Sequence, residues 1–435
     1  MKKILFILII CIFILSACAP QTTEVIVTKE VPVEVIKEVE VVVTEEVEVV
    51  VTKEVEVEVE KIVEKDTSPL AVTIPWTGDA MELFLPVVEG FEAETGINVK
   101  VLPYKTDDLG PLLPAQFMAQ EPMADLMIMS WPWWIEENAE HLVDVTDTTE
   151  GIDFLVNPVV VEGEVYGVPT YTWVKGGFWY RKSLFEEMGL EEPQNWDDFQ
   201  ALMDQLAENP DLENPMTSPA GYPLADIVEH FLAAFGGPEM VQGIIDGDVK
   251  WTDPEVKAVF TDYLIPLIES GAFSDPVERH AAGDLWWEGD YALHYYGNWI
   301  AEDVDDPEDL GILPVPGATS IVGGSDWMFV PKYTERADDA KKFIEYVIGD
   351  EGMKIRLEQG GRLSGRADIP LDVYPPSEKT LAEKVSQFEV LPDLDDTIGG
   401  EWQTAFWDQI ALLWVQTGSL DDVLTTLQEK MPVEE

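Results

Sequence analysis

From about residue 69 onward the sequence alternates between short apolar segments and amphipathic segments with helical spacing. Residues 70–74 are typical of a strand, the apolar positions from Met81 to Phe91 recur every three or four residues, and residues 97–101 alternate as a second strand. The same order continues with an apolar run over 126–129 and helical patterns near 196–206, 340–347 and 406–414. This alternation predicts an α/β protein with mostly parallel sheets and helices on both faces. About 365 residues are enough for two lobes.

Local signals predict where two of these helices begin and end. Asp79 is placed to cap the first helix, and Gly96 to end it, because Asp favours N-caps and Gly favours the left-handed position after a helix. Asn195 is placed to cap a later helix with Phe199 and Leu206 on its inner face.

Residues 1–18 have the composition of a secretory leader. Lys2 and Lys3 precede an apolar run over 4–15, which is shorter than the roughly 20 apolar residues that span a bilayer. Residues 15–18 (LSAC) resemble the lipobox of bacterial lipoproteins. That resemblance implies cleavage before Cys18, attachment of lipid to its sulfur, and an extracytoplasmic protein anchored to the cell membrane at the cell surface or on the periplasmic side.

Residues 19–68 form a low-complexity segment of Val, Glu, Lys and Thr. Five octads can be laid out from Val27, and valine recurs mostly at odd positions, a period of two that suits an extended chain and does not suit a helix. We expect a charged spacer that holds the folded part away from the membrane. Association of these segments between neighbouring molecules is the alternative.

Charge and cysteine content exclude several classes of protein. The 435 residues carry a formal net charge of -59, which repels phosphate backbones and predicts no nucleic-acid partner. Two cysteines cannot form a thiolate zinc site, so we expect no metal and no cofactor. Residues 361–365 (GRLSG) lack the spacing of a nucleophile elbow, there is no P-loop, and no two histidines have helical zinc spacing. The sequence therefore predicts a protein that is not an enzyme.

Six segments, in order, resemble the extracellular solute-binding proteins of ABC importers, specifically the sugar-binding group that includes maltose-binding protein. The resemblance covers nearly all of 70–435. It rests on residues 91–99 (FEAETGINV), 124–126 (ADL), 163–169 (GEVYGVP, a hairpin in the family), 179–190 (WYRKSLFEEMGL), 193–198 (PQNWDD) and 289–299 (GDYALHYYGNW). Ala124 and Arg181 depart from the family pattern, which has Pro and Asn at these positions.

This resemblance implies the type II periplasmic-binding-protein fold, with two α/β lobes, a hinge and a central ligand cleft. Carried over to this sequence, lobe one is expected at about 69–172 plus 317–368, and lobe two at about 173–316 plus 369–435. Open α/β sheets bind ligands beside the carboxyl ends of their strands, so the cleft is also the physically expected place for a site.

Aromatic residues that follow predicted strands are candidate sugar platforms, because flat rings stack on the C–H faces of sugars. The chain has 15 tryptophans, and several stand directly after a strand, where local packing gives little reason for apolar bulk. Asp79 and Lys175 could bind hydroxyl groups, although Asp79 also serves as a helix cap and Lys175 could be a solvated charge. Arg362 and Arg366 flank a segment near which family members place ligand contacts. The candidate ligand-binding residues are Trp76, Asp79, Trp131, Trp133, Tyr171, Trp173, Lys175, Trp299, Trp327 and Trp407. Trp299 and Trp407 are supported by the family resemblance as well, and each tryptophan has core packing as its alternative. Trp286 and Trp287 precede a predicted strand and are expected to serve packing.

The expected function is that of a lipid-anchored receptor that captures an uncharged sugar or oligosaccharide and delivers it to ABC permease subunits. A receptor for a cationic amine such as a polyamine is the alternative, because Trp and Tyr faces attract cations and the chain is rich in carboxylates. A surface glycoside hydrolase is a further alternative, since carboxylate pairs and aromatic platforms also build such sites.

Overall fold

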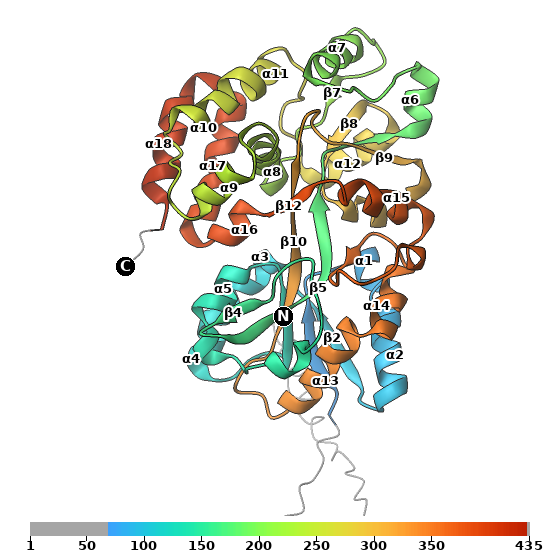
Figure 1. Ribbon diagram of the computed structural model, residues 1–435, viewed down its shortest axis with the longest axis vertical. Coiled ribbons are helices and arrows are strands. Elements are labelled where there is room, and N and C mark those ends of the chain that lie inside the picture. Colours follow the sequence, from blue (N-terminus) through green and yellow to red (C-terminus); the bar gives the residue numbers. More distant parts are fainter. Residues whose placement is uncertain (1–67, 433–435) are drawn as a thin grey trace, which may run out of the picture. The chain divides into compact units, whose positions relative to one another are not determined.

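Two long strands connect two groups of secondary-structure elements in the computed structural model, which describes residues 68–432 (Figure 1). They are β5 (Glu164–Lys175) and β10 (Ser320–Phe329), and they pair antiparallel from Met328–Val168 to Val322–Lys175. One half of β10 pairs with β3 (Leu126–Met129), and the other half pairs with β12 (Glu389–Pro392). The chain therefore leaves one group along β5 and returns along β10.

The first sheet has the strand order β11-β5-β10-β3-β1-β2, with β12 on β10 and β4 on β5. Its other strands are β1 (Leu70–Ile74), β2 (Val99–Pro103), β4 (Val159–Val161) and β11 (Leu363–Ser364). The predicted hairpin is present, since β4 and β5 are joined through Glu162 and Gly163, both with positive φ.

The second sheet has four strands in the order β7-β8-β6-β9. They are β6 (Phe178–Arg181), β7 (Asn214–Met216), β8 (Tyr291–Tyr295) and β9 (Leu310–Leu313). Only β7 and β8 pair parallel in this sheet.

The prediction of mostly parallel sheets is wrong, because both sheets are mixed. Parallel pairs join β1 to β2 and β3, β10 to β12, and β7 to β8, while all pairs involving β5 or β6 are antiparallel. The physical reason is the return of the chain along β10, which places two long strands of opposite direction in the middle of the first sheet. Strand–helix alternation in the sequence does not reveal that return.

Helices cover both faces of the first sheet, as predicted. Leu126 and Ile128 of β3 pack into a core with helices α2 (Leu85–Thr95), α13 (Ala337–Ile348) and α14 (Asp350–Leu357). Met127 and Met129 point to the opposite face and pack with α4 (Leu113–Ala119) and α5 (Pro132–Glu137), near α3 (Thr106–Leu109). This is the alternation of side chains expected for a strand that is buried on both faces.

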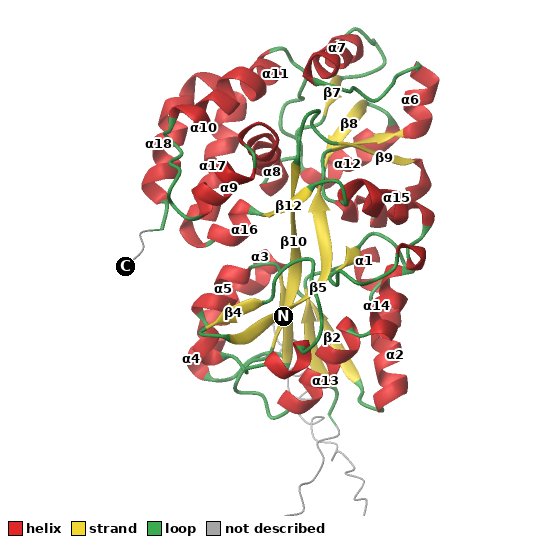
Figure 2. Cartoon of the chain, viewed as in Figure 1, coloured by secondary structure: helices red, strands yellow, loops and turns green. Residues whose placement is uncertain are grey.

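The second sheet is covered in the same way (Figure 2). Phe178 and Tyr180 face the larger core and Trp179 faces the other side, where Trp286 is fully buried and serves packing. The larger core contains α6 (Lys182–Met188), α7 (Trp196–Ala207), α8 (Tyr222–Phe231), α9 (Pro238–Ile245), α10 (Pro254–Val259), α11 (Ile265–Glu269), α16 (Leu394–Ile398), α17 (Gly400–Val415) and α18 (Leu420–Lys430). The opposite face carries α12 (Arg279–Glu288) and α15 (Pro376–Val385).

The predicted helix boundaries are confirmed except at one end. Gly96 ends α2 in the left-handed conformation, and the Asn195 side chain accepts a hydrogen bond from the Asp198 N–H at 3.0 Å. Asp79, in contrast, is the first helical residue of the short helix α1 (Asp79–Glu82), whose N-cap is Gly78. A separate helix starts at Leu85, because Pro86 lacks an N–H and fits only the first turn of a helix.

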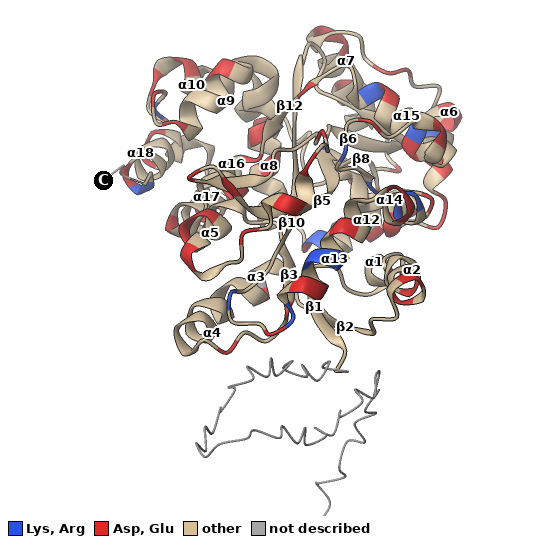
Figure 3. Ribbon diagram, turned by 60° about the horizontal axis from the view of Figure 1, so that its bottom comes forward, with Lys and Arg blue, Asp and Glu red and all other residues tan. Residues whose placement is uncertain are grey.

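The predicted signal peptide, the lipobox with Cys18, and residues 19–67 of the spacer lie outside the described residues. Within the described part of the chain, every helix is too short or too polar to cross a membrane. The lobe boundaries remain a prediction. Acidic side chains are spread over helices of both groups (Figure 3).

Candidate functional site

A cavity of about 250 Å³ lies where the two crossing strands pass between the two groups of elements. Three of its wall segments follow the carboxyl ends of neighbouring strands of the first sheet. Trp76 follows β1, Lys105 and Thr106 follow β2, and Ser130 and Trp131 follow β3. The prediction that ligand-facing residues follow parallel strands therefore agrees with the geometry of this cavity.

Six of the ten candidate ligand-binding residues line the cavity. They are Trp76, Trp131, Trp173, Lys175, Trp299 and Trp407. They come from the ends of β1 and β3, the crossing strand β5, the 3-10 helix η6 (Asn298–Glu302) and the helix α17. Segments as far apart in sequence as residues 76 and 407 are thus brought to one place.

Tyr171 and Trp327 belong to the core of the first group and do not line the cavity. Tyr171 is fully buried, and the guanidinium of Arg356 lies 5.5 Å from its ring centroid. Trp327 is 5% exposed and donates a hydrogen bond to the backbone oxygen of Asn157 at 3.3 Å. Both occupy strand positions whose side chains point into a packed layer instead of the cavity.

Asp79 and Trp133 also lie outside the cavity lining. Asp79 is exposed on α1. Trp133 lies on α5, which begins directly after Trp131 and has Pro132 in its first turn. The Trp133 ring packs against Trp131, with centroids 5.7 Å apart and planes at 31°.

Three aromatic rings form one wall of the cavity. Trp173 meets Trp299 edge to face, and Tyr296 meets Trp299 at 5.3 Å and 67°. The guanidinium of Arg362 lies 5.9 Å from the Trp299 centroid. This packing fixes the orientation of the half-buried Trp299 ring before any ligand arrives.

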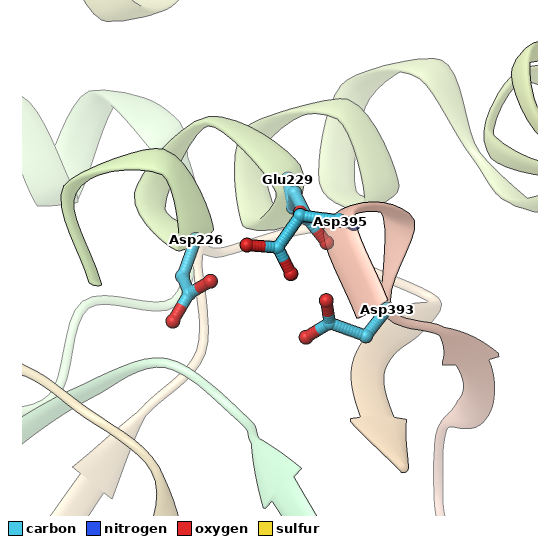
Figure 4. A group of neighbouring side chains, drawn as sticks. All are labelled: Asp226, Glu229, Asp393 and Asp395. Atoms are coloured by element: carbon cyan, nitrogen blue, oxygen red, sulfur yellow. The ribbon is translucent and has the colours of Figure 1, made fainter. Parts of the chain in front are cut away.

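Lys175 is held in a cluster of four buried carboxyl groups at the edge of the cavity. Its Nζ lies 2.8 Å from Asp226 Oδ1 and 2.5 Å from Asp393 Oδ2. Glu229 accepts hydrogen bonds from the backbone N–H groups of Leu394 and Asp395. Figure 4 shows Asp226 and Glu229 on one helix, α8, facing the two aspartates at the start of α16.

Burial sets the proton content of this cluster. Burial raises the pKa of Glu229 and of Asp395 well above the usual range, and the neighbouring Asp393 charge raises both further. Burial also works to raise the pKa of Asp393, but Lys175 and hydrogen bonds outweigh it, so its pKa is lowered. Burial alone would lower the pKa of Lys175, yet Asp226 and Asp393 raise it overall. These directions favour a Lys175–Asp393 ion pair with protons held on Glu229 and Asp395.

The four carboxyl groups offer ligand atoms within 4.8 Å of one another, a spacing that a metal ion could bridge. The Lys175 ammonium already supplies a cation to two of them. The cluster connects Lys175 of the crossing strand β5 to α8 and α16. It also binds Trp407 of α17, whose Nε1 donates a hydrogen bond to Asp395.

A second buried network closes another wall. Glu302 accepts from Arg356 and lies 3.3 Å from Arg362, and all three side chains are almost fully buried. Asn298 donates to the Gly361 oxygen at 3.2 Å and accepts from the Val174 N–H at 2.9 Å. These contacts join η6 to the crossing strand and to the segment after α14.

Sequence reasoning missed most of the polar lining. Asp326 accepts hydrogen bonds from Trp76 Nε1 at 3.0 Å and from Ser130 Oγ at 2.7 Å. The strand pattern did not reveal it, because the pairing of β10 with β5 shifts register between Ser325 and Trp327 and regular alternation is interrupted at Asp326. Lys105 and Tyr296 were also missed, although each follows a strand, β2 and β8 respectively. The other missed lining residues include Tyr222, Arg279, His280, Glu302, Asp303, Asp395 and Asp396, for which no local signal exists.

Two α/β groups joined by crossing strands, with an aromatic and polar cavity between them, define a ligand-capturing receptor with no transmembrane helix in its described part. The chain belongs to the family of bacterial extracellular solute-binding proteins, whose model matches residues 75–354. It is thus the substrate-binding component of an ABC transporter, a class that binds small molecules and delivers them to a permease.

Known proteins similar to this chain support that assignment. An uncharacterised ABC transporter extracellular-binding protein of Pyrococcus horikoshii is 40% identical over 83% of this chain and 88% of its own length. A bacterial solute receptor with an exclusive preference for β-D-galactopyranose has the same fold, with a TM-score of 0.75 at 17% identity, covering 83% of this chain and 98% of the receptor. A maltose-bound protein of T. maritima has a TM-score of 0.70 at 19% identity, covering 83% and 98%.

Proposed function

We propose that this protein captures an uncharged sugar or a short oligosaccharide in the cavity between its two lobes and delivers it to an ABC permease. The observation that carries the proposal is the presence of Trp131, Trp173, Trp299 and Trp407 around a single cavity. Aromatic faces stack on the C–H faces of sugar rings, and each such contact adds about 0.5–1.5 kcal/mol beyond simple burial. The sugar ligands of the structurally similar proteins agree with this chemistry.

The polar lining offers both donors and acceptors to sugar hydroxyl groups. Lys105 and Arg279 supply donors, while Asp303 and Asp396 supply acceptors at the same cavity. Mixed charges of this kind suit a neutral ligand with many hydroxyl groups. The protein acts by binding alone, without covalent chemistry.

A cationic amine is less well served by this cavity. Three of the acidic groups at or beside the cavity already have cationic partners: Lys175 pairs with Asp226 and Asp393, and two arginines pair with Glu302. An incoming ammonium group would have to compete with these buried pairs.

The proposal also includes the membrane anchor and the lobe boundaries. Lipid on Cys18 would retain the protein on the outer side of the cell membrane, and residues 19–68 would hold the folded part away from the membrane. The boundaries near residues 172 and 317 lie within or close to β5 and β10, the strands that cross between the two groups.

A calorimetric panel tests the function. The purified protein is titrated with D-galactose, maltose, longer maltooligosaccharides and spermidine, after a thermal-shift screen against a wider set of sugars. We expect saturable binding of at least one sugar, with little dependence on salt. Tight spermidine binding that weakens steeply with salt, together with no response to any sugar, would overturn the sugar assignment. Release of reducing sugar from a polymer would instead indicate a hydrolase.

A further inference from the structure

The indole of Trp133 packs directly on the backbone of Gly399. A Cβ atom added to Gly399 would overlap Cδ1, Cδ2 and Nε1 of this indole, so no larger residue fits against the ring as it stands. Gly399 has φ 65° and ψ -160°, a conformation that glycine adopts readily and other residues rarely adopt. The contact therefore depends on a ring on one side and a bare backbone on the other.

This contact joins the two groups of elements. Trp133 lies on α5, whose Trp134 and Ile135 belong to the core of the first sheet. Gly399 lies between α16 and α17, whose Leu394 and Trp402 belong to the core of the second group. Figure 1 shows α5 and α16 at facing edges of the two groups.

The same tryptophan is stacked on a residue of the cavity wall. Trp131 lines the cavity and contacts both Trp133 and Gly110, since a Cβ added to Gly110 would overlap the Trp131 ring. Gly110, Trp131, Trp133 and Gly399 therefore form a continuous stack from the first group to the second. A ligand in the cavity would contact this series of residues at Trp131, which lines the cavity.

We propose that Trp133 is a positioning residue that latches the cleft shut, coupling the orientation of the ligand platform Trp131 to contact between the lobes through Gly399. Trp133 Nε1 is buried without a protein hydrogen-bond partner, a cost of this contact that opening would remove. The part that concerns ligand affinity rests on the proposed function, whereas the part that concerns closure does not.

Two adjacent glycines provide a matched test. Gly399 and Gly400 both have positive φ, 65° and 58°, but a Cβ at Gly400 would meet nothing within 4 Å. Gly399→Ala and Gly400→Ala both place an alanine at positive φ, and only Gly399→Ala adds a collision with Trp133. The difference between the two variants isolates the latch.

Closure is measured in the ligand-free protein by single-molecule energy transfer between dyes on Glu137→Cys in α5 and Asp408→Cys in α17. Both positions are exposed, and replacing Cys11 and Cys18 with serine removes every other thiol. We expect Gly399→Ala and Trp133→Ala to lower the closed fraction at least threefold. Gly400→Ala and Trp133→Phe, which keeps a flat ring against Gly399, should resemble the wild type.

Combining the substitutions separates a specific contact from general strain. In a Trp133→Ala background, Gly399→Ala and Gly400→Ala should give equal open fractions, because the ring that collides with the new methyl group is gone. The half-buried Trp287, which lies outside the cavity lining, provides a control as Trp287→Ala and should leave closure unchanged.

Affinity for D-galactose and maltose is then measured by calorimetry. We expect Gly399→Ala to bind at least tenfold more weakly than Gly400→Ala. If neither sugar binds the wild type, the assignment of these sugars fails, while the energy-transfer result still decides the latch. If Gly399→Ala and Trp133→Ala both have the open fraction of the wild type, the latch is overturned. If Gly399→Ala does not fold, the comparison of Trp133→Ala with Trp133→Phe tests the latch instead.

Discussion

The ring of Trp173 meets the ring of Trp299 edge to face, with centroids 5.9 Å apart and planes at 87°. Trp173 is almost fully buried on the crossing strand, while Trp299 is half-buried and borders the cavity. The buried Trp173 ring thus orients the more accessible Trp299 ring. A ligand that stacks on Trp299 therefore costs little additional side-chain entropy.

Trp299→Ala is therefore expected to weaken sugar binding at least tenfold, about 1.4 kcal/mol. The melting temperature of the ligand-free protein should change little, because the ring is only half-buried. Calorimetry and thermal unfolding check the two parts, with Trp287→Ala as the control for loss of a half-buried ring. A large drop in melting temperature with unchanged affinity would show that Trp299 is a core residue.

Trp327→Ala is expected to have the opposite effect. Its ring fills the core between β3, β10 and α5, so its removal should lower the free energy of unfolding by about 3–5 kcal/mol. The folded fraction should bind sugar with wild-type affinity, because the ring does not line the cavity. Urea unfolding and calorimetry on the same preparation test this, and weakened binding without loss of stability would contradict it.

Lys175→Met should destabilise the protein strongly at neutral pH. The substitution leaves Asp226 and Asp393 buried without their cation, and removing one partner from a buried ion pair costs about 3–5 kcal/mol. Chemical unfolding measures this loss. Lys379→Met removes an exposed lysine from α15 and should change stability by less than about 0.5 kcal/mol. Equal effects of the two substitutions would show that the cluster does not depend on Lys175.

Asp226→Asn should flatten the dependence of stability on pH. Burial raises the pKa of Asp226 from 3.8 to about 7, although Lys175 opposes this, so between these values the folded state holds a proton that the unfolded chain has released. Stability falls with rising pH wherever the folded state binds more protons. The wild type should therefore lose stability through Asp226 as the pH rises from about 4 to about 7.

The measurement is the free energy of unfolding in urea at about pH 4.5 and about pH 6.5. The difference between the two values should be smaller in Asp226→Asn than in the wild type. Asp204→Asn removes an exposed carboxylate on α7 and should keep the wild-type difference. An unchanged difference in Asp226→Asn would mean that this carboxyl does not hold its proton in the folded state.

Local periodicity was enough to predict most elements of the fold. The strand over 126–129, the cap at Asn195 and the end at Gly96 are all set by residues within a few positions of each other, so their signals can be found in the sequence. The relative direction of the strands could not be predicted in this way. The antiparallel pairing of β5 with β10 joins residues about 150 positions apart, and no local pattern records it.

The same distinction between local and long-range information applies to the residues of the candidate site. Trp76 and Trp131 could be found because they directly follow strands, and Trp299 and Trp407 because their segments resemble a known family. The sequence does not show which face of a strand a ring occupies. Trp327, predicted as a ligand contact, lies in the core, and its neighbour Asp326 accepts a hydrogen bond from Trp76 beside the cavity.

The family, the α/β class and the supply of aromatic residues at strand ends can be predicted from the sequence, because they depend on the order and spacing of side chains. Which rings share a cavity, the enclosure of Lys175 by carboxyl groups, and the contact of Trp133 with Gly399 depend on how the chain packs. Those relationships arise from packing between segments far apart in the chain, and a charge or a ring acquires its role only from the groups that burial places around it.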